Sequence, residues 1–566
     1  MKKIFMFRLA TSLLGAMLAA AAIFAQTAPD AQPTGQIVGH VQNAVTGDPV
    51  VGAQIELFQF SIGSKRSFPA PHTVSSQPDG SFVLDGLPPG MYSLMASAPN
   101  FAAARYKAAG SSALMDIFNL QPGSQMAGVV LSLQPYANLS GRVVDDTGQP
   151  VSRAEVRAFV SVLMRGKTQL QPGKEATSDD AGKFELKGVP NGKVYISASP
   201  APAAESDTPP SSAATAPEQK LDLVTTFYPD SLTVVGAAPL DVASGQDQGG
   251  IEIHMKRAAT FHIRGKVAVN AAEDSKLFIG VSQSGSPSSI VSRHGQTPGP
   301  GGQFDISGLV PGAYTLRLIE TGTATHVLGR QDVTIAAADV TNVVITRMLP
   351  VTITLHARSE SDEAADLSRV MVNLQPWDDL PRYGPPIVGV NPDGSRTVTV
   401  LPGSYLIHVV GIPPESYISS LQFNQANALD KVIDVPPSGA GQIDVVFRKG
   451  LAQLDGTVAA NGDSSPRNST IVLVPENVAP DGSNLMMRGT GRGSNFSFFA
   501  VPPGRYTAFA VEQFDYNAWQ NSDFIAALAG RGAAVDLNEN DHKRVELTAI
   551  PASDLLQVMA QLGLAE

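Results

Sequence analysis

Nine histidines are the first residues of this 566-residue chain whose side chains could support metal or acid–base chemistry. None of them opens a His-x-x-Glu or His-Glu-x-x-His pattern, the spacings that bring zinc ligands and a catalytic base together in peptidases. They are also dispersed along the chain rather than clustered. We therefore expect no metal site, and we read the histidines as ordinary strand and loop residues.

Patterns for nucleophilic and phosphate chemistry are missing as well. No Gly-x-Ser-x-Gly nucleophile elbow occurs. Gly166-Lys167-Thr168 lacks the glycine five residues upstream that a phosphate loop requires, and the glycine-rich run 489–493 is typical of a hairpin loop. The chain has no cysteine, which excludes a thiolate nucleophile, thiolate metal ligands and disulfides. We predict a protein that is not an enzyme and uses no cofactor.

Two acidic turns are the remaining places for a cation. Asp145-Asp146 and Asp179-Asp180 supply carboxylate oxygens, the ligands that calcium prefers. Further carboxylates at alternating spacing are absent around them. We therefore expect solvated turns rather than calcium sites.

Four aromatic residues lie outside the repeated core pattern, in loop-like surroundings. A flat ring at the edge of a sandwich can stack on a sugar face or anchor a protein contact. The alternative is that these rings cap the ends of their own domains. Both tryptophans lie in the fourth and fifth repeats, so we place the candidate carbohydrate- or partner-binding surface there. The candidates are Trp377, Tyr383, Tyr516 and Trp519.

The elements that would position these rings recur about every hundred residues. The segment Phe82 to Tyr92 has an aromatic-led strand, a Gly-Leu bend and a Pro-Gly reversal before a tyrosine. Five related segments, of which the fourth is worn, end in a glycine two residues before an aromatic or aliphatic residue. That period is the size of a small β-sandwich. We expect an all-β chain of five tandem Ig-like or transthyretin-like antiparallel β-sandwiches with little helix. The glycines of the five reversals are Gly90, Gly192, Gly312, Gly403 and Gly504.

Local residue choices within each repeat carry their own predictions. Four repeats open with a Gly-x-Val strand, as in Gly39-His40-Val41. Glycine at the reversal is needed wherever the backbone φ is positive. The tyrosine two residues later, replaced by Val194 in the second repeat, should fill the core edge while its hydroxyl reaches a backbone group, as in a tyrosine corner.

The N-terminus predicts export. A basic start at Lys2, Lys3 and Arg8 precedes an apolar stretch that ends before Ala25, the three-part pattern of a secretory signal. The alternative is an uncleaved single membrane anchor. No other apolar run has that length, so we expect no membrane insertion after signal removal and a periplasmic, cell-surface or extracellular protein.

Domain boundaries follow from the repeats. Short helices are expected only near the C-terminus, over residues 521–529 with Ser522 as N-cap, and in the tail. We predict a signal peptide at 1–25, a linker at 26–34, sandwiches at 35–135, 136–258 (with an Ala/Pro/Ser/Thr-rich loop at 198–219), 259–349, 350–449 (divergent) and 450–550, and a helical tail at 551–566.

The excess of acidic residues limits the classes of partner that the protein can bind. The net charge is −11, and removing the signal leaves 37 basic against 51 acidic residues, or −14. Such a surface argues against nucleic acid and anionic membranes. Neutral polymers such as carbohydrates, or envelope proteins, remain as expected partners.

The repeats also resemble a known family. Gly141 to Asp145, Gly148 to Val151 and Gly182 to Val194 follow the pattern of carboxypeptidase regulatory-like domains, which have a transthyretin-type fold. The fourth repeat departs from this pattern over 351–355 and lacks the phenylalanine. The resemblance implies a tandem-domain exported bacterial protein of a fold often grouped with carbohydrate-binding sandwiches, and no peptidase unit accompanies it here.

These observations lead to a non-catalytic exported binding or structural protein. The main expectation is recognition of a carbohydrate or envelope polymer through the β-sandwich modules. The first alternative is a protein–protein scaffold or adhesin-like surface protein that uses exposed strand edges. The second is an accessory module of a peptidase system.

Overall fold

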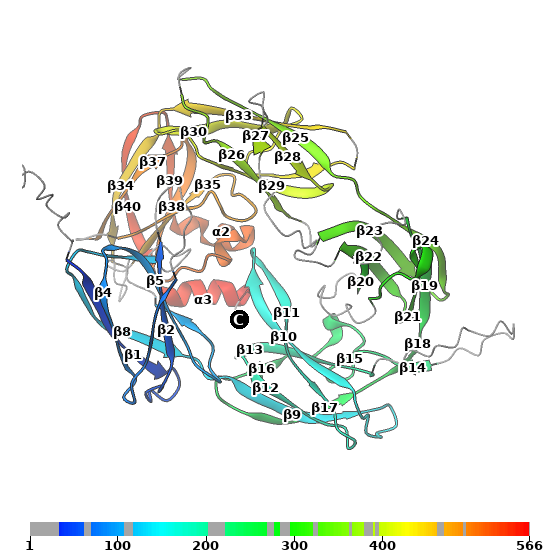
Figure 1. Cartoon of the computed structure of the whole chain (residues 1–566). Coiled ribbons are helices and arrows are strands. Elements are labelled where there is room, and N and C mark those ends of the chain that lie inside the picture. The colour runs from blue at the N-terminus through cyan, green and yellow to red at the C-terminus, as the bar shows by residue number, and fades with distance from the viewer. Residues whose placement is uncertain are drawn as a thin grey trace, which may run out of the picture. The chain divides into compact units, whose positions relative to one another are not determined.

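Strands dominate the computed structural model of this chain (Figure 1). Within the described residues, the two α-helices both follow residue 521, and no helix is long and apolar enough to cross a bilayer. Contacts divide the chain into two compact units, one built of the strands between 35 and 133 and the other of those from 137 onward. The structure describes residues 33–60, 70–106, 117–201, 221–268, 277–283, 295–320, 326–361, 365–377, 389–390, 396–437, 439–460, 469–490 and 494–564.

The first unit is a single β-sandwich. Its strands are β1 (Gly35–Asn43), β2 (Gln54–Phe60), β3 (His72–Ser75), β4 (Ser81–Leu87), β5 (Gly90–Ser97), β6 (Ala104–Arg105), β7 (Ile117–Leu120) and β8 (Gln125–Leu133). One sheet has the order β4-β1-β8, and the other has the order β3-β2-β5-β6 with β7 also paired to β5. Alternating side chains such as Ile37, Leu57 and Tyr92 are fully buried between them.

The second sandwich opens the other unit. Its elements are β9 (Ala137–Val144), β10 (Glu155–Met164), β11 (Lys167–Thr177), β12 (Lys183–Val189), β13 (Gly192–Ser199), β14 (Leu221–Leu223), β15 (Thr226–Phe227), η1 (Val234–Gly236), β16 (Leu240–Val242), β17 (Gln248–His254) and β18 (Arg257–Ala259). Sheet β12-β9-β17 packs against sheet β11-β10-β13-β15, with β16 also on β13. The joint to the next domain is itself the strand β18, which pairs with β14. Of the expected loop 198–219, residues 198 and 199 end β13, and those from 202 lie outside the described residues.

The third sandwich has two three-stranded sheets. Its elements are β19 (Phe261–Ala268), β20 (Leu277–Gln283), η4 (Pro300–Gly302), β21 (Gln303–Leu309), β22 (Gly312–Glu320), β23 (His326–Ile335) and β24 (Val340–Thr346). The orders are β21-β19-β24 and β20-β22-β23. A core that includes Ile263, Ile279 and Leu316 joins them.

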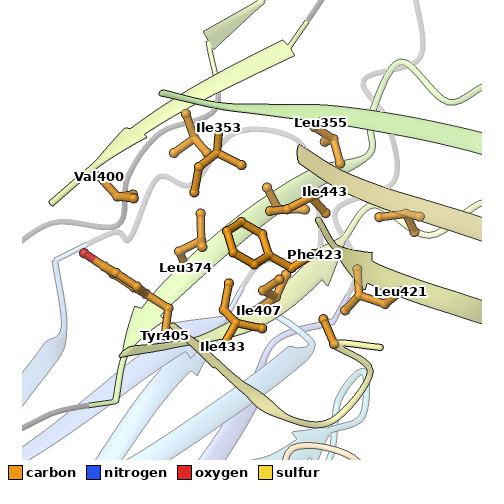
Figure 2. Close-up of a cluster of buried hydrophobic side chains, with 14 of the residues drawn as sticks. Ile353, Leu355, Leu374, Val400, Tyr405, Ile407, Leu421, Phe423, Ile433 and Ile443 are labelled. Atoms are coloured by element: carbon orange, nitrogen blue, oxygen red, sulfur yellow. The ribbon is translucent and has the colours of Figure 1, made fainter. Parts of the chain in front are cut away.

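The fourth sandwich has the least regular sequence but an equally complete core (Figure 2). Its strands are β25 (Val351–Ser359), β26 (Met371–Pro376), β27 (Gly389–Val390), β28 (Arg396–Val400), β29 (Gly403–Val410), β30 (Ser416–Phe423), β31 (Ala426–Asn427), β32 (Val432–Val435) and β33 (Gly441–Lys449). A six-stranded sheet, β27-β28-β25-β33-β30-β31, packs against β26-β29-β32. Figure 2 shows Phe423 at the centre of this core, with Leu374 and Ile443 close to its ring.

The fifth sandwich carries the helices. Its elements are β34 (Ala452–Ala459), β35 (Thr470–Pro475), β36 (Met486–Gly489), β37 (Asn495–Val501), β38 (Gly504–Val511), η7 (Ala518–Gln520), α2 (Ser522–Leu528), η8 (Ala529–Arg531), β39 (Ala533–Leu537), β40 (His542–Ile550) and α3 (Ala552–Gln561). Two parallel pairings between β38 and β40 join the strands in the order β36-β35-β38-β40-β34-β37, with β39 on β38. The expected N-cap Ser522 is wrong: Asn521 has extended backbone angles, and its side chain accepts a 2.8 Å hydrogen bond from the Phe524 N–H.

All five sandwiches share one topology. In each, the first strand is antiparallel to the strand of the repeated signature and parallel to the last strand of the domain. These trios are β1 with β4 and β8, β9 with β12 and β17, β19 with β21 and β24, β25 with β28 and β33, and β34 with β37 and β40. The prediction of a mostly β chain of tandem β-sandwiches is confirmed.

The shared topology explains the Gly-x-Val opening. A Cβ added to Gly265 would lie 2.0 Å from the Val343 carbonyl oxygen and 2.7 Å from the Phe304 ring, so only glycine fits between the last strand and the signature phenylalanine. In the fourth sandwich Leu355 pairs with Arg396 in the corresponding register. The fourth sandwich therefore lacks both the glycine and the aromatic ring that packs against it in the other domains.

The signature tyrosines behave as tyrosine corners, as predicted. In each of the four domains that have one, the hydroxyl donates to the carbonyl oxygen four residues earlier, at 2.6 or 2.7 Å. Burial raises the pKa of Tyr314 to about 12, because the phenolate would be cut off from water. The four tyrosines are Tyr92, Tyr314, Tyr405 and Tyr506.

The expected reason for glycine at the Pro-Gly reversal holds only in part. Gly192 and Gly403 have φ values of 116° and 141°, which disfavour other residues. Gly90 and Gly312 do not adopt positive φ, and an added Cβ there would instead lie 3.2 and 2.6 Å from the side-chain nitrogens of Gln59 and Gln283. At these two positions glycine makes room for a neighbouring side chain.

Candidate functional site at the contacts of the second, fourth and fifth domains

The hairpin of β10 and β11 extends beyond the plan of its domain. These strands have 10 and 11 residues, against 7 and 4 in β2 and β3 of the first domain. At the tip, Arg165 and Gly166 have φ values of 50° and 70°, the backbone of a two-residue type I′ turn. The run that resembled part of a phosphate loop is therefore a hairpin tip followed by the start of β11.

This tip contacts the fifth domain directly. The side-chain amide of Asn521 donates a 2.7 Å hydrogen bond to the Gly166 carbonyl oxygen, which joins residues 355 positions apart. The Thr168 hydroxyl donates to the carbonyl oxygen of Gly563 at 3.1 Å. A Cβ on Gly166 would lie 2.7 Å from the backbone of Gln520 and Asn521. Glycine at this tip permits both the turn and the close approach.

A second hydrophobic core of the fifth domain receives the hairpin. It lies between β35, β38 and the helical segments α2 and α3, and Leu163 of β10 belongs to it with 4% of its surface exposed. Trp519 is at its centre, 1% exposed, with ring centroids 5.2 Å from Phe509 and 5.5 Å from Phe524. Trp519 was a candidate surface residue, and this expectation is wrong. β35 and β38 are buried on both faces, so the loop that carries Trp519 must cover their outer face.

The other candidate aromatics lie along the same contacts. The Trp377 ring is half-buried, with the Arg165 guanidinium 4.7 Å from its centroid, a cation–π arrangement between the fourth and second domains. The Tyr516 hydroxyl donates to the Asp481 carbonyl oxygen at 2.9 Å, and burial together with the Asp481 charge raises the pKa of Tyr516. Tyr383 lies outside the described residues. The structure thus brings Trp377 and Trp519 to the same hairpin tip.

Polar pairs connect the fourth and fifth domains at two places. His408 Nε2 lies 3.1 Å from Asp481 Oδ2, and the Tyr417 hydroxyl donates to Glu539 at 2.8 Å. Although burial alone would favour the protonated form of Asp481, hydrogen bonds from His408 and Ser483 hold its pKa below the usual range. These pairs fix two points of contact between the domains.

A cleft of about 980 Å³ lies at this boundary. Its walls include Ile412 and Pro413 of the fourth domain and Leu485 and Pro502 of the fifth. The carboxyl group of Asp430 belongs to its lining, and burial, strengthened by the Asp481 charge, raises the Asp430 pKa. No sequence pattern marked Asp430, because its setting depends on two domains.

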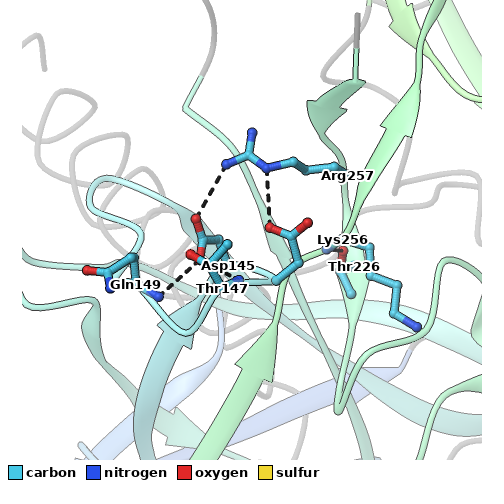
Figure 3. A network of polar contacts seen from close by, with 7 residues as sticks. Asp145, Thr147, Gln149, Thr226, Lys256 and Arg257 are labelled. Atoms are coloured by element: carbon cyan, nitrogen blue, oxygen red, sulfur yellow. Dashed lines mark hydrogen bonds and ion pairs between the residues drawn. The ribbon is translucent and has the colours of Figure 1, made fainter.

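The acidic turn at Asp145 is satisfied by its own surroundings (Figure 3). The Asp145 carboxylate accepts hydrogen bonds from the Thr147 hydroxyl at 2.7 Å and from the Gln149 N–H at 3.0 Å. Arg257, in the joint strand β18, lies 3.2 Å from Asp146 and 3.4 Å from Asp145. The hydrogen bond from Thr147 holds the pKa of Asp145 below its usual range. This carboxylate supports a turn and the second-to-third domain joint.

In the part of the chain that the structure describes, no group of three histidine, aspartate or glutamate side chains is placed to hold a metal ion. Sequence reasoning missed Leu163, Gly166 and Asn521. The unusual length of the alternating run on both sides of Arg165-Gly166 was the signal that could have indicated a protruding hairpin.

Comparisons with known proteins identify the first domain. Residues 36–120 match the family model of the carboxypeptidase regulatory-like domain, which confirms the predicted resemblance for that part of the chain. No curated protein matches the chain.

Several solved bacterial structures have a partial likeness to this chain. They include GBS52, the minor pilin of Streptococcus agalactiae (11% identity, 40% of this chain and 96% of that chain, TM-score 0.24). The Bacillus anthracis TIE protein (11%, 92% and 75%, 0.16) and the shaft pilin SpaA of Lactobacillus rhamnosus GG (11%, 40% and 98%, 0.19) also match. With TM-scores below 0.5, these likenesses define no role for this chain.

Proposed function

We propose that this chain is a non-catalytic, exported scaffold that joins other proteins, with its second, fourth and fifth sandwiches held together by direct contacts. The observation that carries the proposal is that the β10–β11 tip packs into the fifth domain through Leu163 and the Asn521–Gly166 hydrogen bond. A tandem chain whose distant domains are tied in this way holds its surfaces at fixed separations, which suits a scaffold.

The titratable groups support a structural role. Asp481 pairs with His408 across a domain boundary, and Asp145 holds a turn. The raised pKa of Tyr314 accompanies a tyrosine corner in a domain core. Shifted pKa values often mark catalytic sites, but the shifts of Asp481 and Asp145 follow from hydrogen bonds within the architecture, and that of Tyr314 follows from burial.

Carbohydrate recognition has weaker support. A sugar-binding ring must present an open face. Trp519 is in a core, and one face of Trp377 is taken by Arg165. Protein recognition does not depend on these rings.

Photo-crosslinking of the full chain tests the proposal. A benzoylphenylalanine at Phe499, which is 66% exposed, should yield discrete crosslinked proteins from an envelope fraction, and protease pretreatment of that fraction should abolish them. The proposal is refuted if the retained material is a protease-resistant polysaccharide whose binding is lost in Trp377→Ala. It is equally refuted if the chain turns over peptide or ester substrates.

A further inference from the structure

The cleft between the fourth and fifth domains contains a carboxyl group that the protein itself does not neutralise. Asp430 lines both this cleft and an adjoining cavity of about 730 Å³. Among the described residues no lysine or arginine forms an ion pair with it, and its polar partner is the Asn484 side chain. Asp430 is half-buried, and a carboxylate that is partly removed from water without an ion-pair partner marks a place where a positive group is favoured.

The basic side chains that line this cleft already have acidic partners, and Lys431 lines only the adjoining cavity. His408 faces Asp481, Arg448 pairs with Glu360 at 2.7 Å, and Arg505 pairs with Glu476 at 2.5 Å. Each of these acids therefore has its own partner, and of the described lining carboxyls Asp430 is the one left over. A ligand with one positive charge would give Asp430 the ion-pair partner that the other acids already have.

The walls of the cleft favour an apolar ligand with this charge. Ile412, 41% exposed, faces it together with Pro413 from the fourth domain, and Pro502, Pro503 and Leu485 line it from the fifth. A volume of about 980 Å³ is at the upper end of ordinary ligand sites and holds several side chains. A lysine or arginine has the required form, because its aliphatic stem can lie on apolar walls while its head reaches a carboxylate.

We propose that this cleft binds a segment of a partner protein in which a lysine or arginine, flanked by apolar residues, places its charged head on Asp430. The assignment rests on the proposed scaffold role and supplies a recognition chemistry for it. The His408–Asp481 and Tyr417–Glu539 contacts hold the two walls of the cleft, so the site exists only where both domains are in place.

A peptide pool tests this assignment on the full chain. The probe is a pool of acetyl-x-x-Lys-x-x-amide peptides, with x drawn from leucine, valine, proline and tyrosine, and a second pool with norleucine in place of lysine. We expect calorimetry to show that the lysine pool binds at least about tenfold more tightly than the norleucine pool. Norleucine lacks the charged head that would pair with Asp430, and loss of one partner of a desolvated charge pair weakens binding by at least this factor.

Variants locate the binding. Asp430→Asn should reduce lysine-pool affinity to the norleucine level, whereas Asp434→Asn, on β32 and outside the cleft lining, should leave it unchanged. Asp430→Asn removes a half-buried carboxylate at nearly constant volume, and a thermal melt verifies the fold of the variant.

Three results would overturn the assignment: equal binding of both pools, binding of neither, or equal effects of the two variants. Binding of n-hexylamine as tight as that of the lysine pool would show a small-amine site and also overturn it. Discrete crosslinked proteins together with any of these results would leave the scaffold role standing and remove only this site.

Discussion

Gly166→Ala should open the contact between the β10–β11 tip and the fifth domain. The added methyl group would lie 2.7 Å from the backbone of Gln520 and Asn521, and neither backbone segment can move without displacing η7 and the start of α2. Separation of the tip breaks the Asn521–Gly166 hydrogen bond and lifts Leu163 from its core.

The size of the effect follows from these contacts. Burial of Leu163 contributes about 2 kcal/mol. The hydrogen bonds at Gly166 and Thr168 contribute about 1 kcal/mol each. The intact contact is then worth roughly 4 kcal/mol and opens in about one molecule per thousand. If the methyl group removes about 2 to 3 kcal/mol of this, opening rises about a hundredfold.

Thiol labelling measures the opening directly. Because the chain has no cysteine, Leu163→Cys supplies a single thiol that is buried while the tip is seated. Its labelling rate, relative to the unfolded chain in urea, gives the open fraction. Leu163→Cys itself gives up about 1 kcal/mol of the burial that holds the tip, so Gly166→Ala in this background should raise the rate about thirtyfold.

Gly148→Ala is the matched control. Gly148 has a φ of 79°, close to the 70° of Gly166, but an added Cβ there meets nothing within 4 Å. Both substitutions carry the same cost of about 1 kcal/mol for a side chain at positive φ. Equal labelling rates in the two variants, or a Leu163→Cys thiol that reacts like the unfolded chain, would refute the reasoning.

Three further expectations concern stability. Trp519→Ala should destabilise the fifth domain by about 3 to 5 kcal/mol in urea unfolding, while Phe499→Ala, exposed at the surface, should change it by less than about 0.5 kcal/mol; similar values would contradict a core position for Trp519. Tyr314→Phe should lower the free energy of unfolding by about 1 kcal/mol, because the hydroxyl bond is lost. The pKa of Tyr314 is raised to about 12, so the hydroxyl stabilises the fold fully below about pH 10 and stops doing so as pH rises through 12. A phenolate absorbance change of Tyr314 near pH 10 would contradict this. Asp430→Asn should raise the melting temperature at pH 7 to 8, because a raised carboxyl pKa means that ionisation of Asp430 destabilises the fold. The gain in melting temperature should vanish below about pH 4, where the carboxyl is protonated in both the folded and the unfolded chain. A lower melting temperature of the variant at pH 7 would show instead that the ionised carboxylate is stabilising.

Local patterns were sufficient for the plan of each domain. The Pro-Gly reversals, the tyrosine hydroxyl bonds and the Gly-x-Val strands depend on contacts within about one hundred residues, and their residue types have few alternatives. The tyrosine at position 314 needs only the carbonyl four residues upstream. Prediction failed where glycine can be favoured for more than one reason. At Gly90 the backbone φ is not positive, and an added Cβ would instead lie close to the Gln59 side chain.

The candidate site could not be found in this way. Trp519 and Trp377 stand apart from the repeat, but their partners Leu163 and Arg165 come from another domain. A ring that lies on a surface and a ring that lies in an interdomain core have the same local sequence. The local sequence therefore could not distinguish a sugar-stacking ring from a ring that contacts the β10–β11 hairpin.

Local residue patterns are enough to specify a series of β-sandwiches, because alternating burial and turn geometry are local and repeat with a fixed period. The tertiary structure decided which surfaces remain available and where a charge is left without a partner. Asp430 and Gly166 show the reason: their surroundings consist of residues contributed by separate domains, and no periodicity along one domain specifies the position of the next.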